Sequence, residues 1–269
     1  MRSHTGRPAV LTIAGSDSSA GAGIQADLKT FAALGVYGTS AITAVTAQNT
    51  LGVAAVHELP PDIVAAQIEA VVTDIRPDAV KTGMLASAEI IAAVAGKLRQ
   101  HSLPNLVVDP VMLAKSGDPL LRADAVQALR DLLLPLAAVV TPNLPEAEAL
   151  TGYKLASDDD IRRAARDIAA MGPRAVVIKG GHRGGDQAID LLYDGRDFRE
   201  YSAPRIETTS DHGTGCTFAS AIAAFLALGE PLPEAVGRAK EYLTEALRHA
   251  YRIGAGHGPV NHFYRWWDN

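Results

Sequence analysis

Short apolar runs alternate along most of the chain with longer stretches in which apolar residues recur at helical spacing. The first run, residues 9–14, carries β-branched residues and stops at a polar turn, which predicts a buried strand. The stretch after it has apolar residues every three or four positions from Ile24 to Leu34 and then Gly35, which predicts an amphipathic helix with a glycine stop. The chain therefore begins with a strand, a loop and a helix.

This unit repeats with different residues. Further strands are predicted at 40–46, 79–82, 105–109, 137–141 and 175–179, and helices at 62–75, 86–100, 123–133 and 158–171. Because the strands are nearly continuous in apolar residues, both faces of the sheet must be covered. The pattern predicts an α/β fold with a mostly parallel sheet between two layers of helices.

The last third of the chain departs from this repeat. Residues 190–193 and 198–202 flank a turn containing Gly195 and predict a hairpin that finishes the sheet. Two apolar-striped helices are predicted at 214–228 and 234–251. No run of Pro, Ser or charge separates two cores, so we expect one domain over residues 9–269, preceded by a disordered extension over residues 1–8.

Composition and charge narrow the class of partner. The 269 residues are 48% hydrophobic and 20% charged, as expected for a folded protein with a substantial core. A net charge of -5 lacks the clustered positive surplus that binds nucleic acids or anionic membranes, so a small molecule is the expected partner. No apolar run has the length of a membrane span, there is no signal-peptide core, and Cys216 is the single cysteine, so we expect a cytoplasmic protein.

Polar residues follow almost every predicted strand. In an open parallel sheet, ligands bind just beyond the carboxyl ends of the strands, so these residues are candidates for a site. They are Gly15-Ser16-Asp17, Gln48-Asn49-Thr50, Lys81-Thr82-Gly83-Met84, Asp109-Pro110, Thr141-Pro142-Asn143 with Glu146, and Lys179-Gly180-Gly181-His182. Turn chemistry alone explains any one of these groups, but six in succession favour a binding site.

His212-Gly213-Thr214-Gly215-Cys216 opens a predicted helix and is the strongest local motif. Two glycines spaced by one residue let successive backbone N–H groups point into one concavity, and the helix adds the positive end of its dipole. The motif therefore predicts an anion site suited to phosphate, although a purely structural helix cap has the same composition. No G-x-x-x-x-G-K-[ST] motif occurs, which excludes an ordinary P-loop enzyme.

Cys216 lies in the first turn of that helix. The dipole and the N–H groups there are expected to stabilise a thiolate and lower the pKa of Cys216, which would let it accept a proton from a substrate hydroxyl as a general base. The alternative is a small cysteine packed in the core.

Gly21-Ala22-Gly23-Ile24-Gln25-Ala26 fits the G-x-G-x-x-A dinucleotide fingerprint, which would indicate an NAD oxidoreductase. The glycines do not follow the strand directly, and Gln48 stands at the end of the next strand, where a ribose-binding Asp or Glu is required. NAD is therefore the weaker interpretation. Asp27, which borders the apolar stripe of this helix, is equally consistent with a solvated surface carboxylate.

Three oxygen-bearing side chains are candidates for a magnesium site. Asp109 ends one strand, and Asn143 and Glu146 open the helix that follows another. Carboxylates placed opposite an anion site can hold Mg²⁺ directly or through waters. Glu146 is equally consistent with a carboxylate that only complements the helix dipole. The histidines show no H-E-x-x-H motif, so a catalytic zinc site is not expected.

Together these motifs resemble those of the hydroxymethylpyrimidine/phosphomethylpyrimidine kinases of thiamine biosynthesis. The resemblance covers residues 9–263 and rests on 15–17, 21–30, 47–50, 81–85, 109–112, 141–147, 179–182 and 212–216. It implies a ribokinase-like fold, a three-layer αβα sandwich with a mostly parallel central sheet, in a protein that is commonly a homodimer. It also implies MgATP-dependent phosphorylation of 4-amino-5-hydroxymethyl-2-methylpyrimidine, followed by phosphorylation of the monophosphate to the diphosphate.

The same resemblance implies roles for individual residues. The pyrimidine pocket would be lined by Gly15, Asp27, Gln48 and Met84. The anion hole would be formed by Gly213, Thr214 and Gly215, with Cys216 at the position of the base, Lys179 and Thr214 at the nucleotide phosphates, and Asp109, Asn143 and Glu146 around Mg²⁺. The Gln48 amide suits an aminopyrimidine, because it offers one donor and one acceptor to a ring nitrogen and its neighbouring amine.

Two residues depart from the family pattern, and two other functions remain open. Ala20 stands where a second glycine is usual, and Asp211 places a carboxylate beside the anion site, which opposes phosphate binding unless it points away or meets Mg²⁺. Pyridoxal kinases share the glycine-rich loop and the H-G-x-G-C motif. A non-catalytic sensor of a pyrimidine or nucleotide would use the same pocket but would not require Cys216 and Lys179.

Overall fold

The computed structural model describes residues 6–112, 120, 122, 124–180 and 185–267. Residues 1–5 of the predicted N-terminal extension therefore lie outside the described residues. So do residues 181 and 182, which belong to the polar group after the strand predicted at 175–179. Within the described residues, no helix is both long enough and apolar enough to cross a membrane.

Nine described strands form one sheet in the order β3-β2-β1-β4-β5-β6-β7-β8-β9. The neighbours from β2 to β7 are parallel, whereas β3 pairs with β2, β8 with β7 and β9 with β8 in antiparallel fashion. The strands are β1 (Ala9–Asp17), β2 (Tyr37–Asn49), β3 (Gly52–Glu58), β4 (Ala79–Thr82), β5 (Leu106–Val108), β6 (Val139–Val140), β7 (Val176–Ile178), β8 (Gln187–Tyr193) and β9 (Phe198–Pro204). The predicted mostly parallel sheet and its closing hairpin are confirmed.

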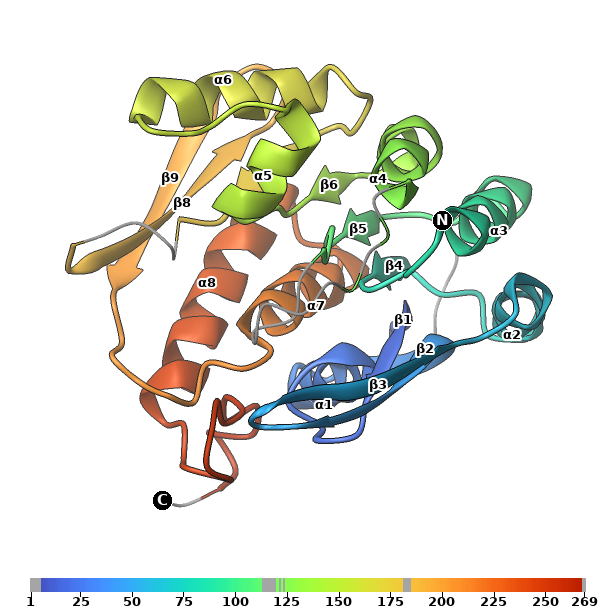
Figure 1. The fold of residues 1–269 in the computed structure, drawn as a ribbon, viewed down its shortest axis with the longest axis horizontal. Helices are drawn as coiled ribbons and strands as arrows, with labels where there is room; N and C mark the ends of the chain where they lie inside the picture. Colours follow the sequence, from blue (N-terminus) through green and yellow to red (C-terminus); the bar gives the residue numbers. More distant parts are fainter. Residues whose placement is uncertain (1–5, 113–119, 121, 123, 181–184, 268–269) are drawn as a thin grey trace.

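Helices cover both faces of this sheet and give the expected three-layer αβα arrangement (Figure 1). One core packs under α2 (Pro61–Asp74), α3 (Ala88–Gln100), α4 (Ala125–Ala128), α5 (Leu144–Thr151) and α6 (Asp158–Ala169). The other packs under α1 (Gly23–Ala33), α7 (Thr214–Ala227) and α8 (Leu232–Arg248). The strands between these cores are buried on both faces, as their continuous apolar sequences predicted.

Three local predictions are corrected by the structure. β1 continues through Asp17 instead of ending at Ala14, because a register shift at Gly15 carries the strand past the glycine. β3 has no counterpart in the prediction. The helix predicted at 123–133 is helical from Ala125, but after Ala128 it changes to a π turn and then a 3-10 turn that contains Pro135.

Candidate active site

A cavity of about 830 Å³ opens where the carboxyl ends of the parallel strands meet the first turn of α7. Every residue to which the family resemblance gave a role lines this cavity, with the exception of Asp27. The lining residues among them are Gly15, Gln48, Met84, Asp109, Asn143, Glu146, Lys179, Gly213, Thr214, Gly215 and Cys216. Residues as far apart in the chain as Gly15 and Cys216 are thus brought to one edge of the sheet, as parallel strand ends require.

The first turn of α7 is locked against the loop that precedes α1. Gly213 caps the helix with a φ of 80°, a conformation that favours glycine. A methyl group there would lie 1.9 Å from the carbonyl oxygen of Gly21, and one on Gly21 would lie 2.3 Å from the ring of His212. Gly21 therefore allows the two loops to touch. Gly23 has a φ of 58°, and a methyl group on it would lie 2.4 Å from the Gly15 carbonyl oxygen, so both glycines of the apparent dinucleotide fingerprint have a packing explanation.

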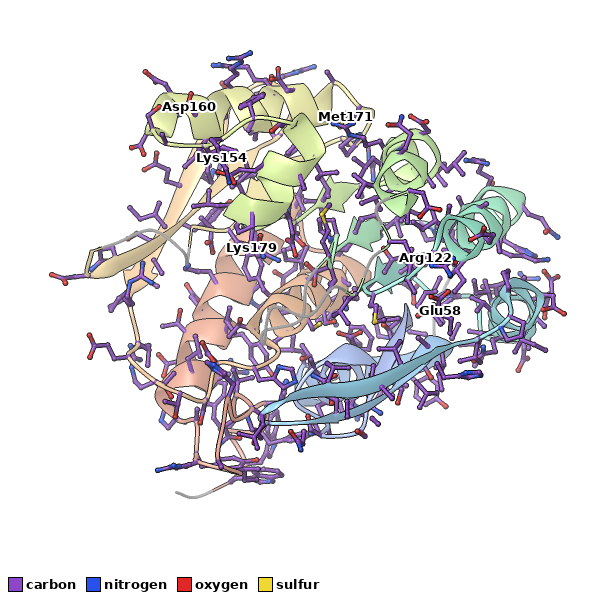
Figure 2. All side chains as sticks on the ribbon, in the orientation of Figure 1. Glu58, Arg122, Lys154, Asp160, Met171 and Lys179 are labelled. Atoms are coloured by element: carbon purple, nitrogen blue, oxygen red, sulfur yellow. The ribbon has the colours of Figure 1, made fainter. Side chains whose placement is uncertain are left out.

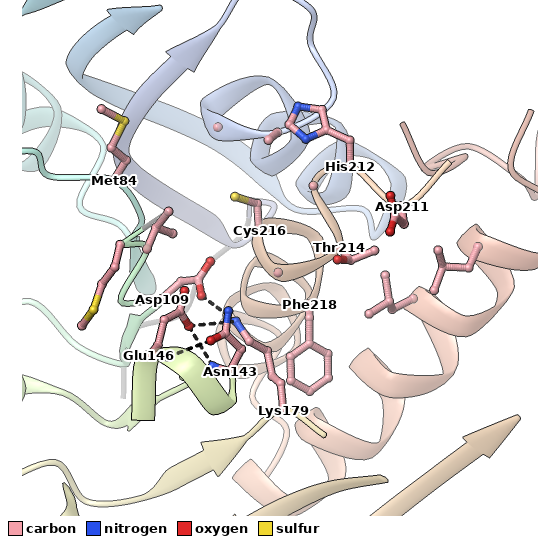
Figure 3. Close-up of a pocket in the computed structure, with 18 of the residues that line it drawn as sticks. Met84, Asp109, Asn143, Glu146, Lys179, Asp211, His212, Thr214, Cys216 and Phe218 are labelled. Atoms are coloured by element: carbon pink, nitrogen blue, oxygen red, sulfur yellow. Dashed lines mark hydrogen bonds and ion pairs between the residues drawn. The ribbon is translucent and has the colours of Figure 1, made fainter. Parts of the chain in front are cut away.

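Lys179 stands between two carboxylates beside that first turn (Figure 3). Its Nζ lies 2.9 Å from Asp109 Oδ1 and 3.8 Å from Glu146 Oε2, and a methyl group on Gly215 would lie 3.3 Å from it. Figure 2 shows Lys179 toward the middle of the molecule, whereas Lys154 lies nearer its outer edge. Burial lowers the pKa of Lys179, but the charges of Asp109 and Glu146 outweigh it and raise that pKa, so the ammonium stays charged.

The side chain of Glu146 is held at the N-terminal end of α5. Its Oε2 accepts a hydrogen bond from the Asn143 amide at 2.7 Å, and the Asn143 side chain accepts one from the Glu146 amide at 2.8 Å, which forms a capping box. Burial raises the pKa of Glu146 to about 7; Lys179 opposes this shift and the nearby Asp109 charge reinforces it. Glu146 therefore titrates near neutral pH.

The donor set on this side of the cavity fits a hard divalent cation that is held mainly by a substrate. Among the described residues, no three His, Cys, Asp or Glu side chains are grouped to hold a metal ion. Asp109 and Glu146 nevertheless offer carboxylate oxygens, which Mg²⁺ prefers, and Mg²⁺ often takes only one or two protein carboxylates beside phosphates and waters. Two carboxylates suit such a partial site.

Cys216 is half-buried at the base of the cavity, and its pKa contradicts the sequence expectation. Burial raises the pKa of the Cys216 thiol to about 11; the Lys81 ammonium and a hydrogen bond from the Gly23 amide oppose that shift, whereas the charges of Asp27 and Asp109 reinforce it. Helix position alone predicted a lowered pKa. Burial of the thiol outweighs the stabilisation of a thiolate by the end of the helix, so the thiol is protonated at neutral pH.

Asp27 does not line the cavity, and the sequence-based assignment is corrected here. Its side chain is fully buried behind the cavity wall. Its carboxylate binds Lys81 Nζ at 2.9 Å and accepts hydrogen bonds from the hydroxyls of Thr12 and Ser220 at 2.6 Å each. The residue lies on α1, joins this helix to β1, β4 and α7, and has no exposed surface.

Two pairs that line the cavity received no role from the sequence. At one end, Asp17 Oδ2 lies 2.8 Å from His212 Nε2, and hydrogen bonds from His212, Ser19 and Ala22 lower the pKa of Asp17 to about 2 although burial acts in the opposite direction. At the other end, Lys240 Nζ lies 2.8 Å from Asp190 Oδ2. The motif that contains His212 was visible in the sequence, but the contacts of its side chain were not.

The structure shows the backbone of Ala20 and the surroundings of Asp211, the two residues that depart from the family pattern. Ala20 has a φ of 62°, in the left-handed region that favours glycine. Asp211 lines the cavity, but its Oδ1 lies 2.7 Å from His257 Nδ1. Part of the Asp211 carboxylate is thus turned toward a neighbouring side chain, which reduces its conflict with a bound phosphate.

Comparisons with known proteins show which family the chain is similar to. The family model described as phosphomethylpyrimidine kinase matches residues 17–261. The hydroxymethylpyrimidine/phosphomethylpyrimidine kinase of Rhizobium meliloti is 57% identical over 262 residues, which are 96% of this chain and 98% of that protein. The thiamine biosynthesis bifunctional protein of Geobacter sulfurreducens is 55% identical over 95% of this chain, but the chain spans only 52% of its length.

Among solved structures, an ADP complex of Bacillus subtilis pyridoxal kinase superposes with a TM-score of 0.91 at 41% identity, covering 98% of this chain and all of that one. The fold is therefore shared with pyridoxal kinases, whereas the sequence is more similar to the pyrimidine kinases. With a family match over most of its length and relatives above 50% identity, the chain belongs to the phosphomethylpyrimidine kinase family.

Proposed function

We propose that the chain transfers the terminal phosphoryl group of ATP to the hydroxymethyl group of 4-amino-5-hydroxymethyl-2-methylpyrimidine, and then to the phosphate of that product, in thiamine biosynthesis. One observation carries this proposal. A single cavity holds the Gln48 amide, the Cys216 thiol, the Lys179 ammonium and the first turn of α7, which together suit an aminopyrimidine, its hydroxyl and a phosphoryl group.

The pyrimidine would lie at the end of the cavity formed by β1, β2 and the segment after β4. Gln48 offers a donor and an acceptor to one edge of the ring. Met84 is 8% exposed and its sulfur closely approaches Gly15, where a methyl group would lie 3.1 Å away. The two residues would form an apolar wall against the ring face, because glycine leaves room for the Met84 side chain.

The phosphoryl group in transfer would lie at the first turn of α7. The amides of Gly213, Thr214 and Gly215 and the positive end of the helix dipole favour negative charge there. Lys179 adds a cation on the same side. Stabilisation of charge as it spreads over the phosphoryl oxygens is the main contribution that such a site makes to phosphoryl transfer.

Asp109 and Glu146 would hold Mg²⁺ together with the phosphates of ATP, with Asn143 fixing Glu146 through the capping box. When bound, Mg²⁺ would supply positive charge that offsets the negative charge of the phosphates. Before ATP binds, the single positive charge of Lys179 partly offsets the charge of these two carboxylates.

Cys216 would accept the proton of the substrate hydroxyl. With a thiol pKa of about 11, it is protonated in the free enzyme, so it does not act as a preformed thiolate. Before it can accept the substrate proton, the thiol must release its own proton to water, so only the small thiolate population acts as the base while the phosphoryl group is transferred; a loose transition state needs little activation of the nucleophile.

The nucleoside part of ATP would lie at the other end of the cavity, which the sequence did not identify. Its walls come from β8, β9, the segment after β9 and α8, and they combine the Lys240–Asp190 pair with several apolar side chains. They include Ala188, Ala203, Ile206, Leu243 and Leu247. A purine base fits an apolar slot of this kind better than a charged triphosphate does.

Pyridoxal kinase remains the second candidate, because the Bacillus subtilis pyridoxal kinase shares the fold so closely. The deciding experiment measures ADP release from MgATP with hydroxymethylpyrimidine, its monophosphate and pyridoxal side by side. We expect turnover with both pyrimidines and a much smaller kcat/KM with pyridoxal. Turnover of pyridoxal alone would support the second candidate, and turnover of none would indicate a sensor.

The proposal includes a homodimer in the cytoplasm. Exposed apolar side chains on β2 and β3 and in the turn between them, Val45, Leu51 and Val56, offer a surface that a second copy could cover. A cysteine that acts in catalysis must stay reduced, which suits a reducing compartment. Light scattering of the purified protein at several concentrations tests the dimer, and a monomer at all of them would contradict it.

A further inference from the structure

The side chain of Gln48 is surrounded by groups that dictate which of its amide atoms faces which neighbour. Its main chain is fixed, because Ser18 Oγ accepts from the Gln48 amide at 2.8 Å and donates to the Gln48 carbonyl at 2.7 Å. The structure places the Gln48 Nε2 atom 3.2 Å from His212 Nε2 and the Gln48 Oε1 atom 3.1 Å from Thr46 Oγ1. The oxygen and the NH2 group of the amide have nearly the same shape, so the hydrogen-bonding capacity of the neighbours decides which of them faces His212 and which faces Thr46.

His212 must act as a donor at Nε2. That nitrogen lies 2.8 Å from Asp17 Oδ2, and both side chains are buried. The same oxygen accepts hydrogen bonds from the Gly21 amide at 3.1 Å and the Ala22 amide at 2.8 Å, as an ionised carboxylate does. Because a carboxylate can only accept, Nε2 carries a hydrogen and offers no lone pair, so any other group beside it must be an acceptor that shares this hydrogen with Asp17.

Thr46 must act as an acceptor toward Gln48. Its hydroxyl has one hydrogen, and the carbonyl oxygen of Ser16, which cannot donate, lies 3.0 Å away. With that hydrogen committed to Ser16, the hydroxyl oxygen presents lone pairs to Gln48. The amide end beside Thr46 must therefore be the nitrogen, and the end beside His212 must be the oxygen.

We propose that Asp17, acting through His212, and Thr46 hold the Gln48 amide with its oxygen toward His212 and its nitrogen toward Thr46, and that these three are positioning residues for substrate specificity. This proposal rests on the proposed function. The amide keeps one free hydrogen and one free lone pair for the substrate. They fit an aminopyrimidine edge with its amine on the His212 side and its ring nitrogen on the Thr46 side.

The fixed order also explains how the site would reject a related ring. A pyridine substrate with no amine beside its ring nitrogen leaves the Gln48 oxygen without a new partner. Because the amide cannot turn around without losing its bonds to His212 and Thr46, the mismatch cannot be relieved.

A double-mutant cycle in the full-length enzyme tests this inference. Thr46→Val and His212→Phe each remove one contact to the amide, and we expect each to raise the KM for hydroxymethylpyrimidine about five- to tenfold while the KM for ATP is unchanged. In a Gln48→Ala background neither change should have a further effect on that KM. Thr46→Ser should restore the wild-type value, and His101→Gln, at a surface pair with Glu69, serves as the matched histidine control.

Additive effects in the Gln48→Ala background would overturn the proposal, because they would show that Thr46 and His212 act elsewhere. The amide order is tested separately by NMR, as nuclear Overhauser contacts of the Gln48 amide hydrogens. Contacts to the Thr46 methyl group are expected, and contacts to the His212 ring instead would overturn the assigned order. Absence of turnover in the wild-type enzyme would count against the proposed function, whereas the NMR contacts do not depend on turnover.

Discussion

Lys81 and Asp27 form an ion pair that is completely enclosed in the protein, with 2.9 Å between Nζ and Oδ2 and no exposed side-chain surface on either residue. Thr12 and Ser220 donate to the same carboxylate. Burial lowers the pKa of Lys81, but the adjacent charge of Asp27 outweighs it and keeps that pKa above its usual value. The pair ties β4 to α1 directly behind the cavity that contains Cys216.

Removal of the Lys81 charge should therefore destabilise the fold strongly. Lys81→Met leaves the Asp27 carboxylate buried without its counterion, and we expect the free energy of unfolding to fall by about 3–5 kcal/mol in urea denaturation. The double variant Lys81→Met/Asp27→Asn should recover much of this loss, because it leaves no buried charge. Lys97→Met, at a partly exposed pair with Glu69, is the control and should cost about 1 kcal/mol or less. Equal losses at Lys81 and Lys97 would contradict the importance of the buried pair.

The raised pKa of Cys216 should be visible in its reactivity. Because Cys216 is the single cysteine, alkylation by iodoacetamide followed by mass spectrometry reports on this residue alone. With a pKa of about 11, the alkylation rate should still rise about tenfold per pH unit between pH 8 and pH 10. A plateau near pH 7 would instead indicate the lowered pKa that the helix position suggested.

The proposed role of Cys216 in proton transfer makes a separate prediction. Cys216→Ala should reduce kcat by about two orders of magnitude, the usual scale for loss of a general base, while ADP still binds. Binding is measured by calorimetry and turnover by ADP release. Unchanged turnover would remove Cys216 from the mechanism and leave charge stabilisation at Lys179 and α7 as the main catalytic contribution.

The sequence predicted the sheet and the edge that carries the site because both depend on local patterns. Apolar runs mark strands that are buried on both faces, and the glycines and polar residues after them mark the turns at their carboxyl ends. β3 was missed for the corresponding reason. Residues 52–58 include Val53 and Val56 but show no alternation of apolar and polar residues, and they are exposed along most of their length. The strand carries no burial pattern and forms where the chain returns along β2 after a tight turn.

The errors within the site concern properties that depend on the folded environment. Asp27 meets Lys81 and Ser220, which are 54 and 193 positions away, so nothing near Asp27 in the sequence indicates that it faces a buried lysine. The helix position of Cys216 was visible in the sequence, but its burial was not, and burial decides the direction of its pKa. Contacts between side chains from distant elements, such as Asp17 with His212, are likewise set only by the fold.

Glu146 should make stability decrease as the pH rises toward neutrality. Its pKa is raised from 4.5 to about 7 in the folded protein, so between these values the folded state keeps a proton that the unfolded state has released. The unfolded state then binds fewer protons, and the free energy of unfolding falls with rising pH. Relative to Glu146→Gln, which preserves the capping box, the wild type should lose about 2–3 kcal/mol between pH 4.5 and pH 7.5.

Urea denaturation of both proteins at several pH values without added Mg²⁺ measures this difference. Glu148→Gln, in the same helix, is the matched control, because the hydrogen bond from Lys154 lowers the pKa of Glu148 and the dependence on pH should have the opposite sign. A difference between wild type and Glu146→Gln that does not vary with pH would show that Glu146 is already ionised at pH 5.

Ala20 offers a site at which a glycine should stabilise the protein. Its φ of 62° costs an L-residue about 1 kcal/mol or more, and its main chain is held there, because the Ala20 amide donates to the Asp17 carbonyl and the Ala20 carbonyl accepts from Lys29. Ala20→Gly should remove this strain and, after the larger entropy of glycine in the unfolded chain is subtracted, raise Tm by about 1–3 °C. Ala22→Gly is the matched control, because Ala22 has an extended φ of -133° and gains nothing from glycine, so its Tm should fall. The comparison separates strain from a general effect of glycine in the loop: if both variants lose stability equally, Ala20 is not strained, and if only Ala20→Gly gains, the left-handed conformation is its cause.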